Sequence, residues 1–206
     1  MKTKRFFTAL AAALTLFAAI SSFAAEVGKE APDFTLTGID GTEHSLSDFA
    51  GKVVVLEWTN YGCPFVKKHY NSGNMQKLQS MAKDKEVVWL SICSSAPGKQ
   101  GHMSASEWLE TTKEKGVQSA AVLIDESGEV GRAYGAKVTP HMYVIDEEGV
   151  LAYNGAIDSI PSASISDIEK ATNYVTAALE AVLSGEKVEQ TMSKPYGCGI
   201  KYARDS

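Results

Sequence analysis

Residues 52–66 have the sequence Lys-Val-Val-Val-Leu-Glu-Trp-Thr-Asn-Tyr-Gly-Cys-Pro-Phe-Val, and this stretch indicates the fold most directly. The apolar run that begins at Val53 is typical of a strand buried on both faces, which is usual in a parallel sheet. After Gly62, Cys63-Pro64 is expected to open a helix, because proline suits the first helical turn. Sites in open α/β sheets form beyond the carboxyl ends of the strands, so this junction is where chemistry is expected.

Cys63 is the first candidate catalytic residue. We expect it at or beside the N-cap of the helix, where the helix dipole and free N–H groups stabilise a thiolate. Lys67 and Lys68 follow closely and add positive charge. Such a thiol should be more acidic and more nucleophilic than a free cysteine. The alternative is a small buried hydrophobic residue, which is what most free cysteines are.

The rest of the chain alternates short apolar strands with helices. The pattern around Gly38–Gly41 predicts two short strands joined by a tight turn, which form an N-terminal β-hairpin. Further strands are expected at 87–92, 122–125, 141–146 and 150–154, and helices at 64–85 (weakened at 71–74), 104–115, 127–134 and 166–183. This order predicts an α/β fold with a central mixed β-sheet flanked by helices.

Composition and charge fit one soluble globular domain. The chain has 206 residues, of which 44% are hydrophobic and 22% charged, with a net charge of −5 and a pI of about 5.4. These values argue against a disordered chain and against nucleic-acid binding, which favours clustered Lys and Arg. We expect a signal peptide at 1–24, a domain at 25–185 and a C-terminal tail at 186–206.

The expected signal peptide has the parts of a secretory leader. Lys2, Lys4 and Arg5 form a basic start, an uncharged apolar run covers 6–23, and small residues precede Ala25. A membrane anchor is the rival interpretation for a run of this length. Cleavage would leave no stable membrane insertion and would put the mature chain in an extracytoplasmic compartment, best a bacterial periplasm, where disulfides persist.

The domain also carries a set of short motifs, namely Phe34-Thr-Leu, Gly41, Leu46-Ser-Asp-Phe-x-Gly-Lys-Val-Val-Val-Leu56, Cys63-Pro64, Ala133-Tyr-Gly135 and Val138-Thr-Pro140. Together, over about residues 28–184, they resemble the redoxin group of the thioredoxin superfamily, which holds peroxiredoxins and secreted thioredoxin-like oxidoreductases. The resemblance is to a peroxiredoxin-like branch with a single Cys-Pro-Phe-Val cysteine. It implies a thioredoxin-like fold, with Cys63 as the redox cysteine and Pro140, after Thr139, as a cis proline packed beside it.

The chain departs from the family pattern in places that bear on activity. Thioredoxin-type reductases carry a second cysteine where this chain has Val66. Peroxiredoxins have Thr or Ser and Pro where this chain has Asn60 and Leu56. Asn60, Tyr61 or nearby N–H groups are therefore expected to stabilise the developing charge. Arg132 could bind a peroxide oxygen, but its place on a short polar helix is typical of the surface.

An oxidised thiol needs a partner, and the chain offers two. Cys93 ends the strand at 87–92, which should run beside 53–58 in the same direction and open on the same sheet edge as Cys63. Cys198 lies on a glycine-flanked tail that could fold back over the site, and peroxiredoxin-type enzymes often use a tail cysteine. Sequence does not give connectivity, so Cys198, Cys93 or neither stays open.

Metal binding is the remaining question. A copper or zinc site made by Cys63, Cys198 and His141 would need a paired ligand motif for support, and the sequence has none. Scattered surface or strand histidines are the simpler interpretation. We expect neither a metal nor a cofactor.

These observations predict a periplasmic thiol oxidoreductase of the peroxiredoxin-like kind. The Cys63 thiolate would react with a small peroxide or a disulfide, a second cysteine would resolve it, and a redox partner protein would supply thiols. The alternative is a non-catalytic thioredoxin-fold module that binds a protein partner or copper or zinc, with Cys63–Cys198 as a structural disulfide. A labile, solvent-open Cys63 would favour the enzyme.

Overall fold

The computed structural model describes residues 24–203, so the predicted signal peptide lies outside the described residues except for its last position. A seven-stranded sheet forms the centre of the molecule, in the order β2-β1-β5-β4-β3-β7-β8. Its strands are β1 (Thr35–Gly38), β2 (Glu43–Ser45), β3 (Val54–Trp58), β4 (Val88–Cys93), β5 (Ala121–Ile124), β7 (His141–Ile145) and β8 (Leu151–Gly155). A second, two-stranded sheet joins β6 (Val138–Thr139) to β9 (Cys198–Gly199).

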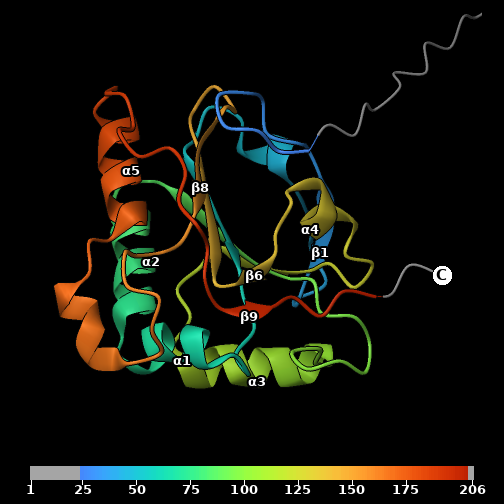
Figure 1. Cartoon of the computed structure of the whole chain (residues 1–206). Coiled ribbons are helices and arrows are strands. Elements are labelled where there is room, and N and C mark those ends of the chain that lie inside the picture. The colour runs from blue at the N-terminus through green and yellow to red at the C-terminus, as the bar shows by residue number, and fades with distance from the viewer. Residues whose placement is uncertain (1–23, 204–206) are drawn as a thin grey trace, which may run out of the picture.

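Helices cover both faces of the large sheet. They are α1 (Pro64–Asn71), α2 (Asn74–Asp84), α3 (Ala105–Lys115), α4 (Glu129–Ala133) and α5 (Tyr174–Leu183), with 3₁₀ turns η1 (Leu46–Phe49) and η2 (Ile165–Lys170). Figure 1 shows α2 and α5 on one side of the sheet and α4 on the other. Among residues 24–203, no helix combines the length and the apolar character that a membrane crossing requires.

The strand directions confirm the predicted mixed sheet. Strands β3, β4 and β5 are parallel, whereas β1 and β7 run antiparallel to their neighbours and β8 forms an antiparallel edge. The hairpin of β1 and β2 pairs Leu36 with His44 and forms the opposite edge. The predicted strand at 53–58 is therefore central, and both of its faces are covered.

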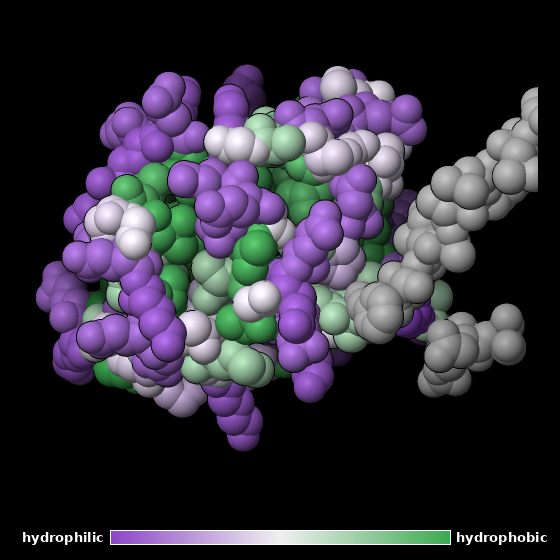
Figure 2. Space-filling model, turned by 90° about the horizontal axis from the view of Figure 1, so that it is seen from above, coloured by the Kyte–Doolittle hydropathy of each residue, from purple (hydrophilic) through white to green (hydrophobic). Residues whose placement is uncertain are grey.

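Alternation along β3 separates two hydrophobic cores. Val55 packs in the core that lies towards α1, α2 and α5. Leu56 and Trp58 pack in the core on the other face, with Tyr134 after α4. All five residues of β3 are buried, as expected for a strand between two helical layers. At the surface, Figure 2 shows that hydrophilic residues predominate on the upper face, with apolar residues exposed in patches between them.

Two of the predicted helices are interrupted. The expected helix at 64–85 breaks where predicted, because Gly73 adopts a left-handed conformation (φ +76°) between α1 and α2. The single helix expected at 166–183 is wrong. Its first part is the 3₁₀ turn η2, and α5 begins only after Asn173, whose side chain accepts a hydrogen bond from the Thr176 N–H at 2.9 Å and caps the helix.

Over residues 186–203, the expected tail folds back onto the domain, as the sequence analysis allowed. Its strand β9 pairs antiparallel with β6, and Ile200 N–H donates to the Lys137 carbonyl at 3.1 Å. Further along, the Tyr202 hydroxyl donates to the Ala136 carbonyl at 2.8 Å. The tail thereby crosses the molecule beside β6 and continues past α4 (Figure 1).

Candidate active site

Cys63 is the N-cap residue of α1, with Pro64 at the first helical position, as the sequence predicts. Its N–H donates to the Asn60 carbonyl at 2.9 Å, which closes the turn between β3 and α1. Cys63 has no exposed surface (0%), so the solvent-open thiol that would favour the enzyme is not observed. The thiol is not sealed in purely apolar packing, however, because polar groups from two other segments meet it.

The first of these groups is the peptide between Thr139 and Pro140, which is cis. The Cys63 thiol donates to the Thr139 carbonyl at 3.1 Å. The Thr139 hydroxyl is buried and has no hydrogen-bond partner among the described residues. A buried hydroxyl that lacks a partner is costly, and a thiolate on Cys63 would supply an acceptor.

The second group is Cys198, which β9 holds opposite Thr139 in the ladder with β6. The preceding Gly197 makes this approach possible. A Cβ atom at Gly197 would lie 2.0 Å from the Thr139 carbonyl oxygen, and its φ of +144° is one that other residues rarely adopt. Cys198 is half-buried, and both thiols are free.

The surroundings of the two thiols separate their pKa values. Burial raises the pKa of Cys63. The Cys198 thiol, the Val66 N–H and the Thr139 hydroxyl, which can donate to the thiolate, together outweigh burial, so the pKa is lowered overall. Burial and the neighbouring Cys63 raise the pKa of Cys198 to about 11. Cys63 therefore ionises first, and Cys198 remains the protonated donor beside it.

The Cys93 thiol has a different hydrogen-bond partner. It ends β4 as predicted, but it is buried and its thiol is 3.5 Å from the Gly101 carbonyl. Burial raises its pKa. Within the described residues, the Cys63 thiol donates to the Thr139 carbonyl, and the groups that lower its pKa include Cys198 and Val66 but not Cys93.

Asn60 organises the turn rather than facing a substrate. Its side-chain oxygen accepts the Gly62 N–H at 2.9 Å, and its amide donates to the Gln100 carbonyl at 3.3 Å. Tyr61 is buried edge-on against Tyr70, and burial raises the pKa of its hydroxyl. Neither side chain is among the groups that stabilise the sulfur. Of the groups expected to do so, only the backbone N–H at the helix start, from Val66, is among them.

The histidine proposed for a metal site is engaged elsewhere. His141 Nε2 is 2.8 Å from Asn154 Oδ1, and its Nδ1 accepts the Lys137 N–H at 3.3 Å. Burial lowers its pKa to about 4. No group of three or more His, Cys, Asp or Glu side chains arranged for a metal ion occurs within residues 24–203.

Two cations weighed in the sequence have structural roles. Lys68 is buried and forms an ion pair with Asp158 at 3.2 Å. The groups that lower the pKa of Cys63 include the Cys198 thiol, the Val66 N–H and Thr139, and the expected contribution of Lys68 stays a prediction. Arg132 donates to the carbonyls of Ser127 and Ala203 at 2.8 Å and covers the Tyr202 ring, which ties α4 to the tail.

Glu57 was not among the predicted site residues, although a carboxylate inside an apolar strand is unusual and could have indicated a special role. It is fully buried and accepts hydrogen bonds from Tyr70, Trp89 and Ser91 at 2.9–3.1 Å. Burial raises its pKa against the effect of these donors. It links β3 to α1 and β4 behind the turn that carries Cys63.

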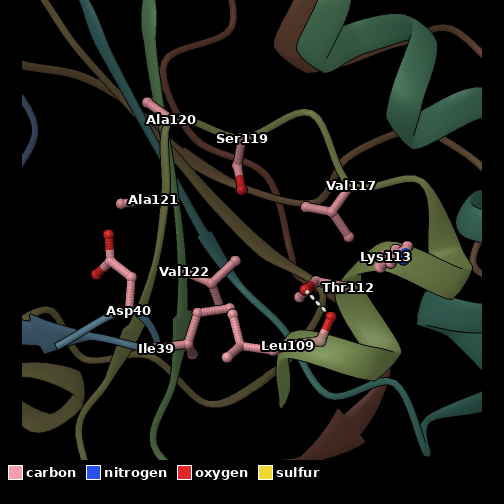
Figure 3. A pocket seen from close by; sticks show the side chains of 10 residues that line it. All are labelled: Ile39, Asp40, Leu109, Thr112, Lys113, Val117, Ser119, Ala120, Ala121 and Val122. Carbon is pink, nitrogen blue, oxygen red and sulfur yellow. Dashed lines mark hydrogen bonds between the residues drawn. The ribbon is translucent and has the colours of Figure 1, made fainter. Parts of the chain in front are cut away.

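A pocket of about 310 Å³ between α3 and β5 lies apart from these groups. Figure 3 shows Leu109 and Ile39 facing Val122 at one end, with Ser119 and Val117 at the other. None of its lining residues is a cysteine, so it is not part of the thiol site.

The chain is similar to known proteins in both sequence and structure. A family model described as Redoxin matches residues 26–172. The chain is 28% identical over 124 residues to thiol-disulfide oxidoreductase ResA of Bacillus thuringiensis subsp. konkukian, a match that covers 60% of the chain. The chain spans 66% of the length of that relative, just under two thirds.

Solved structures share the architecture. An uncharacterized conserved protein from Geobacillus kaustophilus has a TM-score of 0.77 and 29% identity, with 88% of this chain and 94% of that chain covered. A thiol:disulfide interchange protein DsbE of Chlorobium tepidum, described as putative, has a TM-score of 0.51 and 25% identity over 64% of this chain and 85% of its own. These neighbours confirm the predicted thioredoxin-like fold.

Proposed function

This chain belongs to the Redoxin family of the thioredoxin superfamily, and from that premise we propose that it is a thiol–disulfide oxidoreductase whose redox pair is Cys63 and Cys198. The observation that carries the proposal is geometric: the Cys63 thiol at the helix N-cap lies 3.1 Å from the Thr139 carbonyl, and Cys198 pairs with Thr139 in the ladder between β6 and β9. The lowered pKa of Cys63 and the raised pKa of Cys198 support it. ResA and DsbE, to which the chain is similar, are named for the same kind of chemistry.

The reaction begins with the Cys63 thiolate. It attacks one sulfur of a substrate disulfide, the substrate S–S bond breaks, and one substrate thiolate leaves with the electron pair. Cys198 then gives up its proton and attacks the sulfur of Cys63, which releases the second substrate thiol. The substrate gains two electrons, and the protein is left with a Cys63–Cys198 disulfide.

A small peroxide is the second substrate in this proposal. The thiolate attacks one peroxide oxygen, the O–O bond breaks, and Cys63 becomes a sulfenic acid while the other oxygen leaves with a proton as water or an alcohol. The Cys198 thiol condenses with the sulfenic acid, which forms the Cys63–Cys198 disulfide and releases one water. The Thr139 hydroxyl, buried without a partner, supports this step because it can replace the hydroxyl that peroxiredoxins carry at the position of Asn60.

A thiol from a partner protein would restore the pair. The predicted signal peptide supports a periplasmic site of action. In that oxidising compartment, such partners would keep thiols reduced. Because Val66 stands where thioredoxin-type reductases have their second cysteine, the tail supplies the resolving thiol in this proposal.

Disulfide mapping by mass spectrometry tests the proposal. The wild type, Cys63→Ser, Cys198→Ser and the matched control Cys93→Ser are each oxidised with hydrogen peroxide or oxidised glutathione and digested without reduction. We expect a Cys63–Cys198 disulfide in the wild type and in Cys93→Ser, and none in the other two. A Cys63–Cys93 bond, or equal oxidation of Cys63→Ser, would overturn the assignment. A bond that resists mild thiol reductant would favour the structural module instead.

A further inference from the structure

Outside the thiol site, the described part of the chain contains a buried ion pair that the reaction does not use. Lys68 Nζ lies 3.2 Å from Asp158 Oδ2, and both side chains are almost completely buried. Lys68 belongs to α1, the helix that Cys63 caps, and Asp158 follows β8. A buried carboxylate and a buried ammonium stabilise each other, because either charge without its partner would strongly destabilise the fold.

The same carboxylate binds the tail. The Tyr196 hydroxyl donates to Asp158 Oδ1, which also accepts the Ile160 N–H at 3.1 Å. Burial and the neighbouring carboxylate raise the pKa of Tyr196, so its hydroxyl remains a donor. His69 Nε2 lies 3.8 Å from Asp158 Oδ2, but burial lowers the pKa of His69 to about 4 and keeps the ring neutral.

Ring contacts extend this arrangement to the helix start. The Tyr196 ring packs edge-on against Phe65 with centroids 5.8 Å apart, and Lys68 Nζ lies 5.8 Å from the Tyr196 centroid. Phe65 is two residues after Cys63, and Tyr196 is two residues before Cys198. The two cysteine-bearing segments are therefore joined a second time, beside the thiols, by side chains that do not touch either sulfur.

We propose that Asp158, held by Lys68, and Tyr196 are positioning residues that fix the tail on α1 and so present Cys198 to Cys63. This inference rests on the proposed redox pair. For a thiol on a free tail, the linker sets the effective concentration at which the intramolecular disulfide forms. When the tail is held in the geometry of the disulfide, that effective concentration is much higher. Anchoring thus determines how readily the pair oxidises, and it affects the acidity of Cys63 only through the placement of the Cys198 donor.

The test is the equilibrium between the protein disulfide and glutathione. Tyr196→Phe keeps the ring on Phe65 and removes the hydroxyl that binds Asp158. The matched control is Tyr174→Phe, whose hydroxyl makes no hydrogen bond to another described residue. We expect Tyr196→Phe to lower the effective concentration of the Cys63–Cys198 disulfide roughly ten-fold, which corresponds to about 1.4 kcal/mol, and Tyr174→Phe to leave it unchanged.

A second measurement separates positioning from general destabilisation. The Tyr196→Phe change is made on a Cys198→Ala background, which removes the donor at position 198, and the alkylation rate of Cys63 is followed against pH. On that background, we expect the same alkylation midpoint with and without the Tyr196→Phe change. An unchanged effective concentration in Tyr196→Phe, or an equal fall in Tyr174→Phe, would overturn the inference. A wild type that forms no Cys63–Cys198 disulfide would instead defeat the proposed function, so the two failures are distinguishable.

Discussion

Thr139 and Cys198 lie directly opposite each other in the antiparallel ladder between β6 and β9, and the Thr139 carbonyl also accepts the Cys63 thiol at 3.1 Å. One residue therefore contacts both cysteine-bearing segments. Changes at this junction should alter the redox behaviour of the two thiols more than they alter the fold, since the large sheet is built from other strands.

The first expectation concerns the acidity of Cys63. Its pKa is lowered although burial opposes this, and the Cys198 thiol is the leading donor. Cys198→Ala should therefore raise the midpoint at which the first thiol ionises, from below the ordinary cysteine value of 9.0 in the wild type. Ultraviolet absorbance of the thiolate against pH measures it. Cys93→Ala is the control and should leave the midpoint in place, and a Cys198→Ala midpoint equal to the wild type would contradict the electrostatic argument.

A second expectation concerns Gly197. Alanine there would place its Cβ 2.0 Å from the Thr139 carbonyl oxygen at a φ of +144°. Relieving that clash costs on the order of 1–3 kcal/mol and should move Cys198, so the Cys63–Cys198 disulfide should become harder to form by roughly ten-fold or more. Gly199→Ala is the matched control, because its Cβ would meet only the Lys137 carbonyl, 4.0 Å away. Glutathione equilibria of both variants are compared, and equal values would refute the steric argument.

The third expectation is which sulfur a reductant attacks. Cys63 is 0% exposed, whereas Cys198 is half-buried. Cys63 is also the better leaving group, because its pKa is the lower of the two. Glutathione added to the oxidised protein should form its mixed disulfide on Cys198 and release the Cys63 thiolate. Acid quenching followed by peptide mapping identifies the site, and glutathione recovered mainly on Cys63 would reverse this order of attack.

The fourth expectation is a pH dependence of stability caused by Glu57. Its pKa in the folded protein is raised above the ordinary 4.5 by burial, so its contribution to stability is fully present below that value and is lost as pH rises through the folded pKa. Glu57→Gln removes the titration. The free energy of unfolding of the wild type, relative to Glu57→Gln, should therefore fall from acid to neutral pH in urea denaturation.

An exposed carboxylate provides the comparison for Glu57. Glu148 lies in the turn between β7 and β8 and is exposed, so Glu148→Gln should leave the pH profile close to that of the wild type. A constant difference between the wild type and Glu57→Gln at every pH would show that Glu57 does not titrate on folding in the expected range.

Local patterns account for most of the architecture. The buried strand before Cys63, the helix start at Pro64 and the capping box of Ser104 and Glu107 were all predictable, because each depends on neighbours within one helical turn or one strand. The error at 166–183 arose where the apolar helical pattern continued across Asn173. The local capping hydrogen bond of that residue decides where the helix begins.

The sequence by itself determined that a cysteine would follow a central strand and cap a helix, because strand burial, proline geometry and the helix dipole act over a few residues. Only the tertiary structure decided that Cys198 and not Cys93 would meet it, that the thiol would be covered, and that Asp158 would join Lys68 to Tyr196. These contacts join residues far apart in the chain. Their energies depend on which buried charges and hydrogen-bonding groups find partners once the core has formed, and short-range patterns carry no record of that.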